Sequence, residues 1–448
     1  MHQKSRTSEP TTNTSGEAGS VVVGDETKRV SSETMSSGTA LLEVALTREN
    51  MVKAWKRVKA NKGSAGVDGR SIAETADWLK SHWPQVKESI LSGSYRPAPV
   101  RRVMIPKPDG SERQLGIPTV LDRVIQQALL QVLQPQIDPS FSEHSYGFRP
   151  GRSAHQAILK AQSYVQSGRV YVVDVDLEKF FDRVNHDVLM SRFESRISDQ
   201  RVLCLIRRYL QAGMLANGMM VDRFEGTPQG GPLSPLLANV LLDEVDRTLE
   251  KRGHCFVRYA DDCNVYVRSH QAGERVLAGL RALYGKLRLK LNEAKSAVAK
   301  ATERKFLGFS FYRYKGQVKR CEARKAVQAY KDRIRQLTRR SGGKSIEQVV
   351  EKLRTYQLGW KNYFRLSETP RVFQSLDEWL RHRLRVIHLK HWKRGKTAYA
   401  ELIKLKASPS DSAKVAQNMR CWWVNGMRRL NRALPISYFD RLGVVRLS

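Results

Sequence analysis

The stretch His254-Cys-Phe-Val-Arg-Tyr-Ala-Asp-Asp-Cys-Asn-Val-Tyr-Val267 places two adjacent carboxylates between two apolar runs of β-forming residues. This pattern predicts a β-hairpin with Asp261 and Asp262 at its tip. Adjacent carboxylates repel each other and are tolerated most easily when a divalent cation neutralises them. The alternative is that the pair is ordinary turn chemistry, because Asp favours turns.

A second acidic strand lies in Val172-Val-Asp-Val-Asp-Leu-Glu-Lys-Phe-Phe-Asp182. Asp174 and Asp176 fall on one side of an alternating strand, and Asp176 lies near its C-terminal end. An acidic residue in an apolar strand is costly without a partner. If this strand packs beside the hairpin, Asp176, Asp261 and Asp262 converge. Three carboxylates can hold two Mg²⁺ ions about 4 Å apart, an arrangement that activates a 3′-hydroxyl and stabilises a leaving pyrophosphate.

The charge of the chain points to a polyanionic partner. The 448 residues include 78 Lys and Arg against 44 Asp and Glu, a formal net charge of +34. Nucleic acid is favoured over an anionic membrane, because no apolar run reaches the roughly 18 residues that a membrane span needs. Residues 301–448 hold 35 basic and 11 acidic residues and five of the eight tryptophans. This mixture predicts an RNA-binding surface, and the alternative is a solvated helical domain with a Trp-rich core.

The local patterns predict a mixed α+β fold. Residues 1–40 include 19 Ser, Thr or Gly and are expected to form a disordered leader. Strands are expected as a pair over 98–120, at 170–176 and as a hairpin over 254–268. Helices are expected over 41–95, 121–165 with a break at 135–151, 185–217, and from about 322 to the end with a break at 341–343.

Three boxes in this order resemble those of the reverse transcriptases encoded by group II introns. Tyr259-Ala-Asp-Asp262 resembles the YxDD box, residues 176–182 resemble the first catalytic motif, and Gly226-Thr-Pro-Gln-Gly-Gly-Pro-Leu-Ser-Pro-Leu-Leu-Ala-Asn239 resembles the PQG motif. The YADD tetrapeptide alone is a modest signal, whereas three boxes in order are specific. The resemblance spans about residues 50–445. It implies an RNA-directed DNA polymerase in which Asp176, Asp261 and Asp262 are catalytic and bind two Mg²⁺, with Leu177 as a further metal-binding position.

The resemblance also implies four nucleotide-binding residues, Lys107, Arg113, Phe181 and Gln229. Lys107 and Arg113 flank the turn of a fingers hairpin over 105–118, where cations clamp a triphosphate. Phe181 stands where the family has a ring that clashes with a ribose 2′-hydroxyl and selects dNTPs; the alternative is a core residue. Gln229 is expected to contact the incoming nucleotide or a template base.

Template and primer contacts are implied at Arg149, Arg152, Lys295, Leu307 and Gly308. The two arginines belong to the block over 146–153, and the alternative for them is surface ion pairing. Lys295 ends the block over 289–295, and Leu307 and Gly308 lie in the block over 306–309, which resembles the primer-gripping region of the family.

The C-terminal third resembles the maturase region of the family. Residues 355–364 resemble domain X, which serves as the thumb. Arg381, Arg385 and His388 recur near helical spacing and are expected to form one RNA-facing stripe. The full set of expected RNA-binding residues is Arg381, Arg383, Arg385, Lys390, Lys393 and Arg394. The expected domains are right-hand fingers and palm over 41–315, an α-helical thumb over 316–385, and a small, basic, DNA-binding-like helical segment over 386–448. No HNH-like endonuclease motif with paired cysteines follows, so cleavage of the bottom DNA strand is not expected.

The sequence therefore predicts a cytoplasmic RNA-directed DNA polymerase that also binds its group II intron RNA, assists splicing and supports intron mobility by target-primed reverse transcription. The expected partners are intron RNA, target DNA, an RNA template with a DNA primer, and dNTPs, but no membrane. Two alternatives remain. One is a free-standing relative acting in defence or repair. The other is a non-enzymatic RNA-binding splicing factor, which the complete set of three aspartates disfavours.

Overall fold

The structure is a computed structural model that describes residues 41–448 apart from 107–109, 111, 217 and 340–342. The predicted leader over 1–40 lies outside the described residues. Three helices open the described chain, and they confirm the helical prediction for 41–95: α1 (Leu41–Ala45), α2 (Arg48–Ala60) and α3 (Ile72–Leu91). The start of α3 is fixed by a capping box, in which Ser71 and Glu74 satisfy each other's backbone N–H groups. Helix α2 packs on α4 (Val120–Ile137) through a small apolar cluster of its own.

The first sheet has the strand order β2-β1-β4-β5. Its strands are β1 (Val100–Pro106), β2 (Glu112–Ile117), β4 (Met214–Ala216) and β5 (Met219–Val221). The β1–β2 hairpin confirms the strand pair predicted over 98–120. The helix predicted over 185–217 is wrong at its end, since α6 (His186–Glu194) and α7 (Gln200–Gln211) give way to β4. Met214 in β4 pairs with Val100 in β1, and this pairing makes the segment a strand. A pairing partner elsewhere in the fold here outweighs the local preference for a helix.

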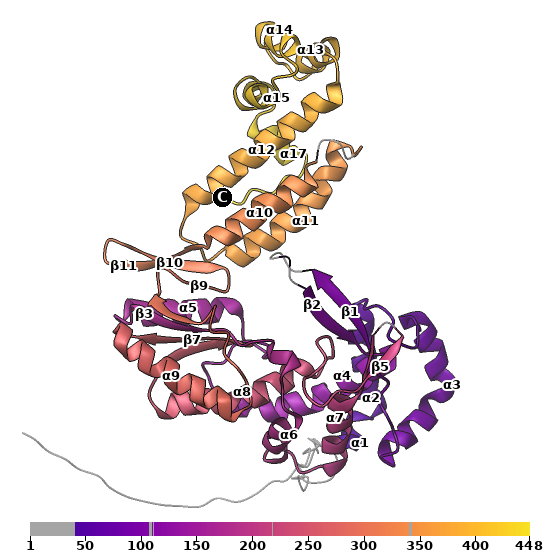
Figure 1. Cartoon of the computed structure of the whole chain (residues 1–448). Helices are drawn as coiled ribbons and strands as arrows, with labels where there is room; N and C mark the ends of the chain where they lie inside the picture. Colours follow the sequence, from indigo (N-terminus) through magenta and orange to yellow (C-terminus); the bar gives the residue numbers. More distant parts are fainter. Residues whose placement is uncertain (1–40, 107–109, 111, 217, 340–342) are drawn as a thin grey trace, which may run out of the picture. The chain divides into compact units, whose positions relative to one another are not determined.

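The palm sheet has the order β6-β7-β3-β8 and is covered on both faces (Figure 1). Its strands are β3 (Tyr171–Val175), β6 (Cys255–Tyr259), β7 (Asp262–Val267) and β8 (Ala297–Lys300). Val173 and Val265 point into a core shared with α8 (Ser234–Lys251) and α9 (His270–Lys286). Val172 and Val257 point the other way, into a second core with α5 (Ala154–Gln166). Strands buried on both faces explain the near-continuous apolar runs around the acidic residues.

The C-terminal third is helical after one small sheet, as predicted from about 322. The sheet consists of β9 (Lys305–Phe306), β10 (Phe309–Tyr314) and β11 (Gln317–Glu322). The helices are α10 (Arg324–Leu337), α11 (Ile346–Phe364), α12 (Pro370–Trp392), α13 (Gly395–Lys404), α14 (Pro409–Gln417), α15 (Trp422–Val424), α16 (Leu430–Ala433) and α17 (Ile436–Arg441). Short helical turns lie at 138–140, 180–182 and 425–429. Two of the three positions of the expected break, 341 and 342, lie outside the described residues.

The fold class predicted from the sequence, α+β with a helical C-terminal region, is confirmed. Two of the expected domain boundaries fall within structural units. The one at 315/316 lies in the turn between β10 and β11, and the one at 385/386 lies inside α12. The division into domains therefore stays a prediction. Among the described helices, none is both long and apolar enough to cross a membrane.

Candidate active site

The β6–β7 hairpin carries Asp261 and Asp262 at its tip, as the sequence predicts. Tyr259 pairs with Asp262, so Ala260 and Asp261 form a two-residue turn, and Ala260 adopts a left-handed φ of 59°. Strand β3 pairs with β7 so that Val175 faces Cys263. Continuing that register places Asp176, the residue after β3, beside Asp262. The sheet itself therefore brings the three predicted carboxylates to one edge.

The negative charges at this edge oppose one another's ionisation. Partial desolvation, followed by the charges of Asp261, Asp174 and Asp176, raises the pKa of Asp262 to about 6. Desolvation and Asp176 likewise raise the pKa of Asp261. Lys295 offers one compensating charge, with its Nζ 3.8 Å from Oδ2 of Asp176. Arg304 offers another, with its Nη2 2.8 Å from Oδ2 of Asp174, so the negative charge at this edge is partly balanced.

The donor groups at the tip suit a divalent cation, although they do not form a closed binding set. No group of three or more His, Cys, Asp or Glu side chains within the described parts of the chain is close enough to hold a metal ion. A divalent cation would nevertheless relieve the repulsion that raises the two pKa values. Leu177 lies between two backbone bonds, Asn292 N to Asp176 O at 2.8 Å and Glu178 N to Lys290 O at 2.9 Å. Its own carbonyl takes part in neither of these two bonds.

A buried arginine supports the turn from behind. Arg258 is fully buried and pairs with the equally buried Asp246, with 2.6 Å between Nη2 and Oδ2. Its Nη1 donates to the carbonyl of Ala260 at 2.8 Å and to Oδ1 of Asn239 at 3.0 Å. On the other side, a Cβ at Gly147 would come within 2.1 Å of the Ala260 nitrogen, so only glycine fits there. The sequence analysis missed Arg258, although a charged residue inside an apolar strand is a usable signal.

Three of the four predicted nucleotide-binding residues line one cavity of about 730 Å³. Arg113, Phe181 and Gln229 meet there, and Nε of Arg113 donates to Oε1 of Gln229 at 2.6 Å. Phe180 is 3% exposed and belongs to the core, whereas Phe181 is half-buried and faces the cavity. Of the two neighbouring rings, Phe180 is therefore the core residue and Phe181 is the one that faces the cavity. The fourth predicted residue, Lys107, lies outside the described residues.

The same cavity has a wall that the sequence analysis did not find. Arg57 from α2, Arg123 from α4 and Phe148 also line it. Nη2 of Arg123 donates to the carbonyl of Ser64 at 2.6 Å, and burial lowers the pKa of its guanidinium. No local pattern identifies these residues, because three separate segments bring them together.

A second cavity, of about 1170 Å³, adjoins the carboxylates. Asp176 and Asp262 line it together with the three residues predicted to face the primer, Lys295, Leu307 and Gly308. Leu307 and Gly308 both adopt left-handed φ values, 49° and 79°, so the chain turns sharply at this wall. The turn is held from outside by Tyr363 in α11, whose hydroxyl donates to the Leu307 carbonyl at 2.8 Å.

Two family descriptions match this chain, and they adjoin each other. Residues 105–311 match "Reverse transcriptase (RNA-dependent DNA polymerase)". Residues 327–405 match "Group II intron, maturase-specific domain". The chain thus carries a reverse transcriptase domain followed by a group II intron maturase-specific domain. This confirms the resemblance on which the sequence analysis relied, and the divalent metal ions that reverse transcriptases generally use suit the acidic tip.

Individual relatives agree with this assignment. The chain is 38% identical over 218 residues to "Protein YkfC" of Escherichia coli, covering 47% of this chain and 57% of that protein. It is 33% identical over 259 residues to "Group II intron-encoded protein LtrA" of Lactococcus lactis, covering 56% and 42%. The chain thus spans about half the length of these curated relatives. A solved "Partial Cas6-RT-Cas1--Cas2 complex" matches at 24% identity with a TM-score of 0.37, covering 55% of this chain and 42% of that chain.

Arg149 and Arg152 have different environments. Arg149 is 9% exposed, and its guanidinium bonds to the carboxylate of Asp138 at 3.0 Å and to the carbonyl of Ser142 at 2.5 Å. These contacts favour the alternative of ion pairing for Arg149, inside the fold instead of at its surface. Arg152 is more exposed, lies over the ring of Tyr146 and is 3.7 Å from Glu143. A template contact therefore stays a prediction for both arginines, and Arg152 is the more accessible of the two.

The predicted RNA-facing stripe on α12 is wrong in two of its three positions. Arg385 is 4% exposed and donates to the Leu434 carbonyl at 2.9 Å, and burial lowers its pKa to about 10. His388 is 7% exposed, and burial lowers its pKa to about 4. Both face the core because the last helices of the reverse transcriptase pack over this side of α12. Arg381 alone of the three remains half-exposed.

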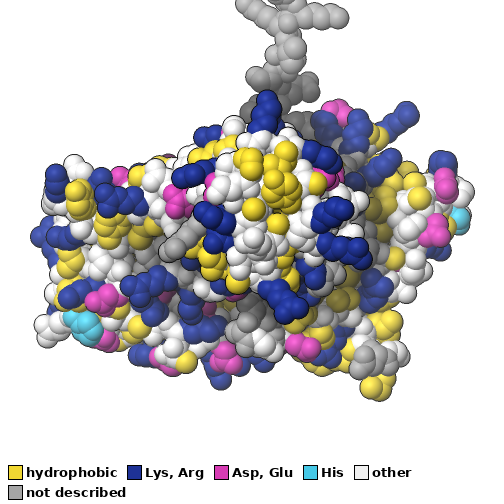
Figure 2. Space-filling view, turned by 90° about the horizontal axis from the view of Figure 1, so that it is seen from above, with side chains coloured by type: hydrophobic (Ala, Val, Ile, Leu, Met, Phe, Trp, Pro, Cys, Tyr) yellow, Lys and Arg dark blue, Asp and Glu magenta, His cyan; other side chains and the backbone are white. Residues whose placement is uncertain are grey.

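The other predicted RNA-binding residues have mixed environments. Arg383 donates through Nε to the hydroxyl of Thr338 at 2.7 Å, whereas Lys390, Lys393 and Arg394 are exposed. Figure 2 shows Lys and Arg side chains spread around an apolar patch on the C-terminal end of the reverse transcriptase. Large exposed apolar residues of this region are Tyr399, Ile403, Trp423, Val424 and Met427. The positive surface of the maturase region is therefore broad and is not confined to one helix.

Proposed function

We propose that this chain is an RNA-directed DNA polymerase that adds dNTPs to a primer 3′-end and also binds a group II intron RNA to assist its splicing. The observation that supports the proposal is the edge of the palm sheet, where Asp176 and Asp262 line one cavity and Asp261 lies next to them in the hairpin turn. Lys295, Leu307 and Gly308 line the same cavity, and Arg113, Phe181 and Gln229 line the other. A nucleotide on one side and a primer end on the other would meet at the carboxylates.

The three aspartates, with the carbonyl of Leu177, would hold two Mg²⁺ ions. Bound Mg²⁺ supplies charge neutralisation at the 3′-oxygen and at the departing pyrophosphate. The reaction joins the primer 3′-oxygen to the α-phosphorus of the dNTP, breaks the bond from that phosphorus to the β-phosphate oxygen, and releases the hydroxyl proton to solvent. The raised pKa values at the tip are the property of this chain that favours such ions.

Side chains of the nucleotide cavity would select and orient the dNTP. Arg113 presents a guanidinium suited to phosphate oxygens, and Gln229 fixes its direction through their 2.6 Å bond. Phe181 presents its ring to the same cavity and would exclude a 2′-hydroxyl by steric overlap. Lys107, proposed as a second cation for the triphosphate, rests on the sequence alone.

The maturase region supports the part of the proposal that concerns splicing and mobility. The chain carries 35 basic and 11 acidic residues over 301–448, and Lys390, Lys393 and Arg394 are exposed there. This surface would hold folded intron RNA, while the RNA itself performs splicing chemistry. Target DNA and target-primed reverse transcription complete the proposed cycle. The free-standing alternative would be favoured if no group II intron RNA surrounds the reading frame.

Primer extension on poly(rA) annealed to oligo(dT) tests the polymerase half. Purified protein should incorporate dTTP when Mg²⁺ is present and not when it is chelated. Asp261→Asn should abolish incorporation and leave RNA binding close to that of the unmodified chain. An absence of incorporation by folded protein would favour the non-enzymatic splicing factor instead.

A further inference from the structure

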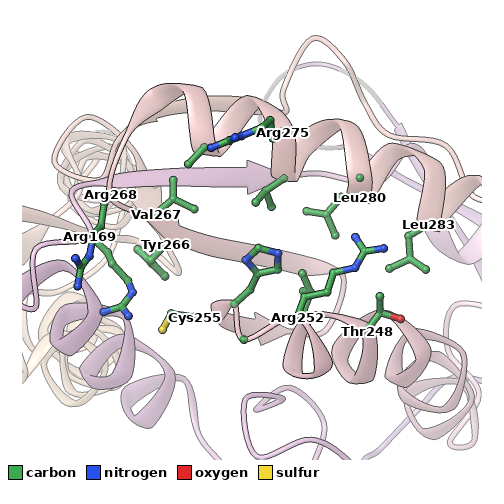
Figure 3. A pocket seen from close by; sticks show the side chains of 16 residues that line it. Arg169, Thr248, Arg252, Cys255, Tyr266, Val267, Arg268, Arg275, Leu280 and Leu283 are labelled. Carbon is green, nitrogen blue, oxygen red and sulfur yellow. The ribbon is translucent and has the colours of Figure 1, made fainter.

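A third hollow, of about 490 Å³, lies at the end of the β6–β7 hairpin opposite to the carboxylates (Figure 3). It is bounded by the end of α8, by α9 and by the strand ends that begin β6 and finish β7. Cys255 and Tyr266 pair across the hairpin here, whereas Tyr259 and Asp262 pair at the tip. The two pairs are four residue steps apart along the strands, a distance of about 13 Å. The hollow is thus a separate site on the same sheet.

Four arginines surround this hollow, and Figure 3 shows them spread around it. Arg169 and Arg268 lie together at one end, Arg252 at the other, and Arg275 projects from α9. Across the described chain, no carboxylate oxygen lies within ion-pair distance of any of the four, although many other arginines of this protein are paired. Like charges held around one hollow repel, so the arrangement favours a bound anion.

The floor of the hollow is apolar. Leu280, Leu283 and Val267 form part of it, and all three belong to the core shared with α8 and α9. His254 also lines it, and burial and the neighbouring Arg252 lower the pKa of its imidazole. A small inorganic anion would use the arginines but leave this floor unfilled. A nucleobase would cover the floor only if it were unpaired, which is common in loops and bulges of folded RNA.

We propose that this hollow anchors an unpaired nucleotide of a bound RNA, with the base against the apolar floor and the flanking phosphates on Arg169, Arg252, Arg268 and Arg275. The inference rests on the proposed RNA-binding function, but it assigns a site outside the polymerase cavities and outside the maturase region. Arginines at both ends of the hollow suit phosphates on both sides of one nucleotide.

Photo-crosslinking provides a direct test, because it reports where on the chain a base lies. An unstructured RNA oligonucleotide that carries one 4-thiouridine is bound to the full chain and irradiated, and the crosslinked peptides are identified by mass spectrometry. Crosslinks should form on residues that line the hollow, among them Leu280 and Leu283 on α9. Helix α7, which does not line the hollow, is the internal control and should not be crosslinked. An absence of crosslinks in the hollow at an RNA concentration about ten times the Kd would overturn the proposal, as would equal competition by AMP or inorganic phosphate.

Matched variants distinguish RNA binding in the hollow from a general effect of positive charge. Arg252→Gln with Arg275→Gln removes two charges at the hollow, whereas Arg281→Gln with Lys286→Gln removes two charges elsewhere on α9. The first pair should lower the salt dependence of RNA binding by about 1.4 in log–log slope and abolish the crosslinks in the hollow, and the second pair should preserve those crosslinks. Identical behaviour of the two pairs would show that only the overall charge matters.

A third variant fills the hollow without changing charge. Gly279 lies on α9, and a Cβ there would meet only the flexible end of Arg252, at 3.3 Å. Gly279→Leu should therefore fold and lose the crosslinks in the hollow, whereas retained crosslinks would contradict a base-sized site. Extension of a pre-annealed primer should be unchanged in all these variants. If the unmodified chain fails to extend primers but RNA still crosslinks to the hollow, the polymerase proposal fails and this one stands.

Discussion

The two ends of the β6–β7 hairpin carry opposite charge. At the tip, burial and neighbouring carboxylates raise the pKa of Asp261 and of Asp262. At the far end, Arg252 and Arg268 face a hollow with no carboxylate in ion-pair contact among the described residues. One short pair of strands thus has an acidic end and a basic end about 13 Å apart. The comparison teaches that the net charge of +34 hides local fields of both signs. The predictions below concern the acidic end, the arginine that supports it and the cavity beside it.

The largest effect is expected at the acidic end. Asp261→Asn should lower primer extension by at least about 10³-fold, because a neutral amide cannot replace the metal-binding carboxylate. The metal-free variant should unfold at no lower temperature than the unmodified chain, since the substitution removes a repelling charge. Extension rates and thermal melting in chelator measure both effects, and a less stable metal-free variant would contradict the electrostatic account of the tip.

Removal of Arg258, which bonds to the turn of the β6–β7 hairpin, should give the next largest effect. Arg258→Met leaves Asp246 buried without its partner, which should cost about 3–5 kcal/mol of unfolding free energy. The double variant Arg258→Met with Asp246→Leu should recover most of that stability. It should not recover activity, because the Ala260 carbonyl still lacks its donor. Chemical denaturation and kcat separate the two roles, and full activity in the double variant would mean that Arg258 only stabilises.

Sugar selection should change at the nucleotide cavity. Phe181→Val should relax discrimination against rNTPs by about 10²-fold, because the ring that faces the cavity is shortened. Phe180→Leu is the matched control, since Phe180 is buried and should affect stability and not selection. The ratio of kcat/KM for dTTP and UTP measures the effect. A larger change in that ratio from Phe180→Leu would reverse the assignment.

The pH dependence of metal use should be the smallest effect. Asp262 has a pKa of about 6, above the roughly 3.9 of an unfolded Asp, so its protonated form is favoured in the folded chain. The raised pKa of Asp262 therefore stabilises the metal-free folded chain most below pH 4, and this stabilisation is lost as the pH rises through about 6. Protons should compete with Mg²⁺, raising the half-saturating Mg²⁺ concentration by up to about tenfold for each pH unit below 6. A half-saturating concentration that is constant from pH 5 to 8 would argue against Asp262 as a ligand.

Local patterns in the sequence predicted the acidic hairpin and most of the fold. Two apolar strands around Asp261 and Asp262 specify a hairpin, and the alternation in β3 places Asp176 at the correct edge. The neighbouring strand pairing of β4 was missed because it depends on Val100, more than 100 residues earlier. Propensity carries no information about such distant partners.

Burial was the hardest property to predict. Helical spacing correctly places Arg385 and His388 on one side of α12, but it cannot say whether that side is covered. The covering segments follow in the chain, and Leu434 supplies the carbonyl that receives Arg385. Arg258 was missed for a related reason, because its buried partner Asp246 lies on another element.

The bond from Tyr363 to the Leu307 carbonyl has a practical consequence for protein engineering. It ties α11 of the maturase-specific domain to the loop that lines the cavity beside Asp176, and Phe364 packs at the same loop against Phe309. A chimera that exchanges the maturase-specific domain between relatives at residue 327 would separate these partners. A transplant that carries residues 304–311 together with α11 keeps the contact whole, so the natural exchangeable unit begins inside the palm.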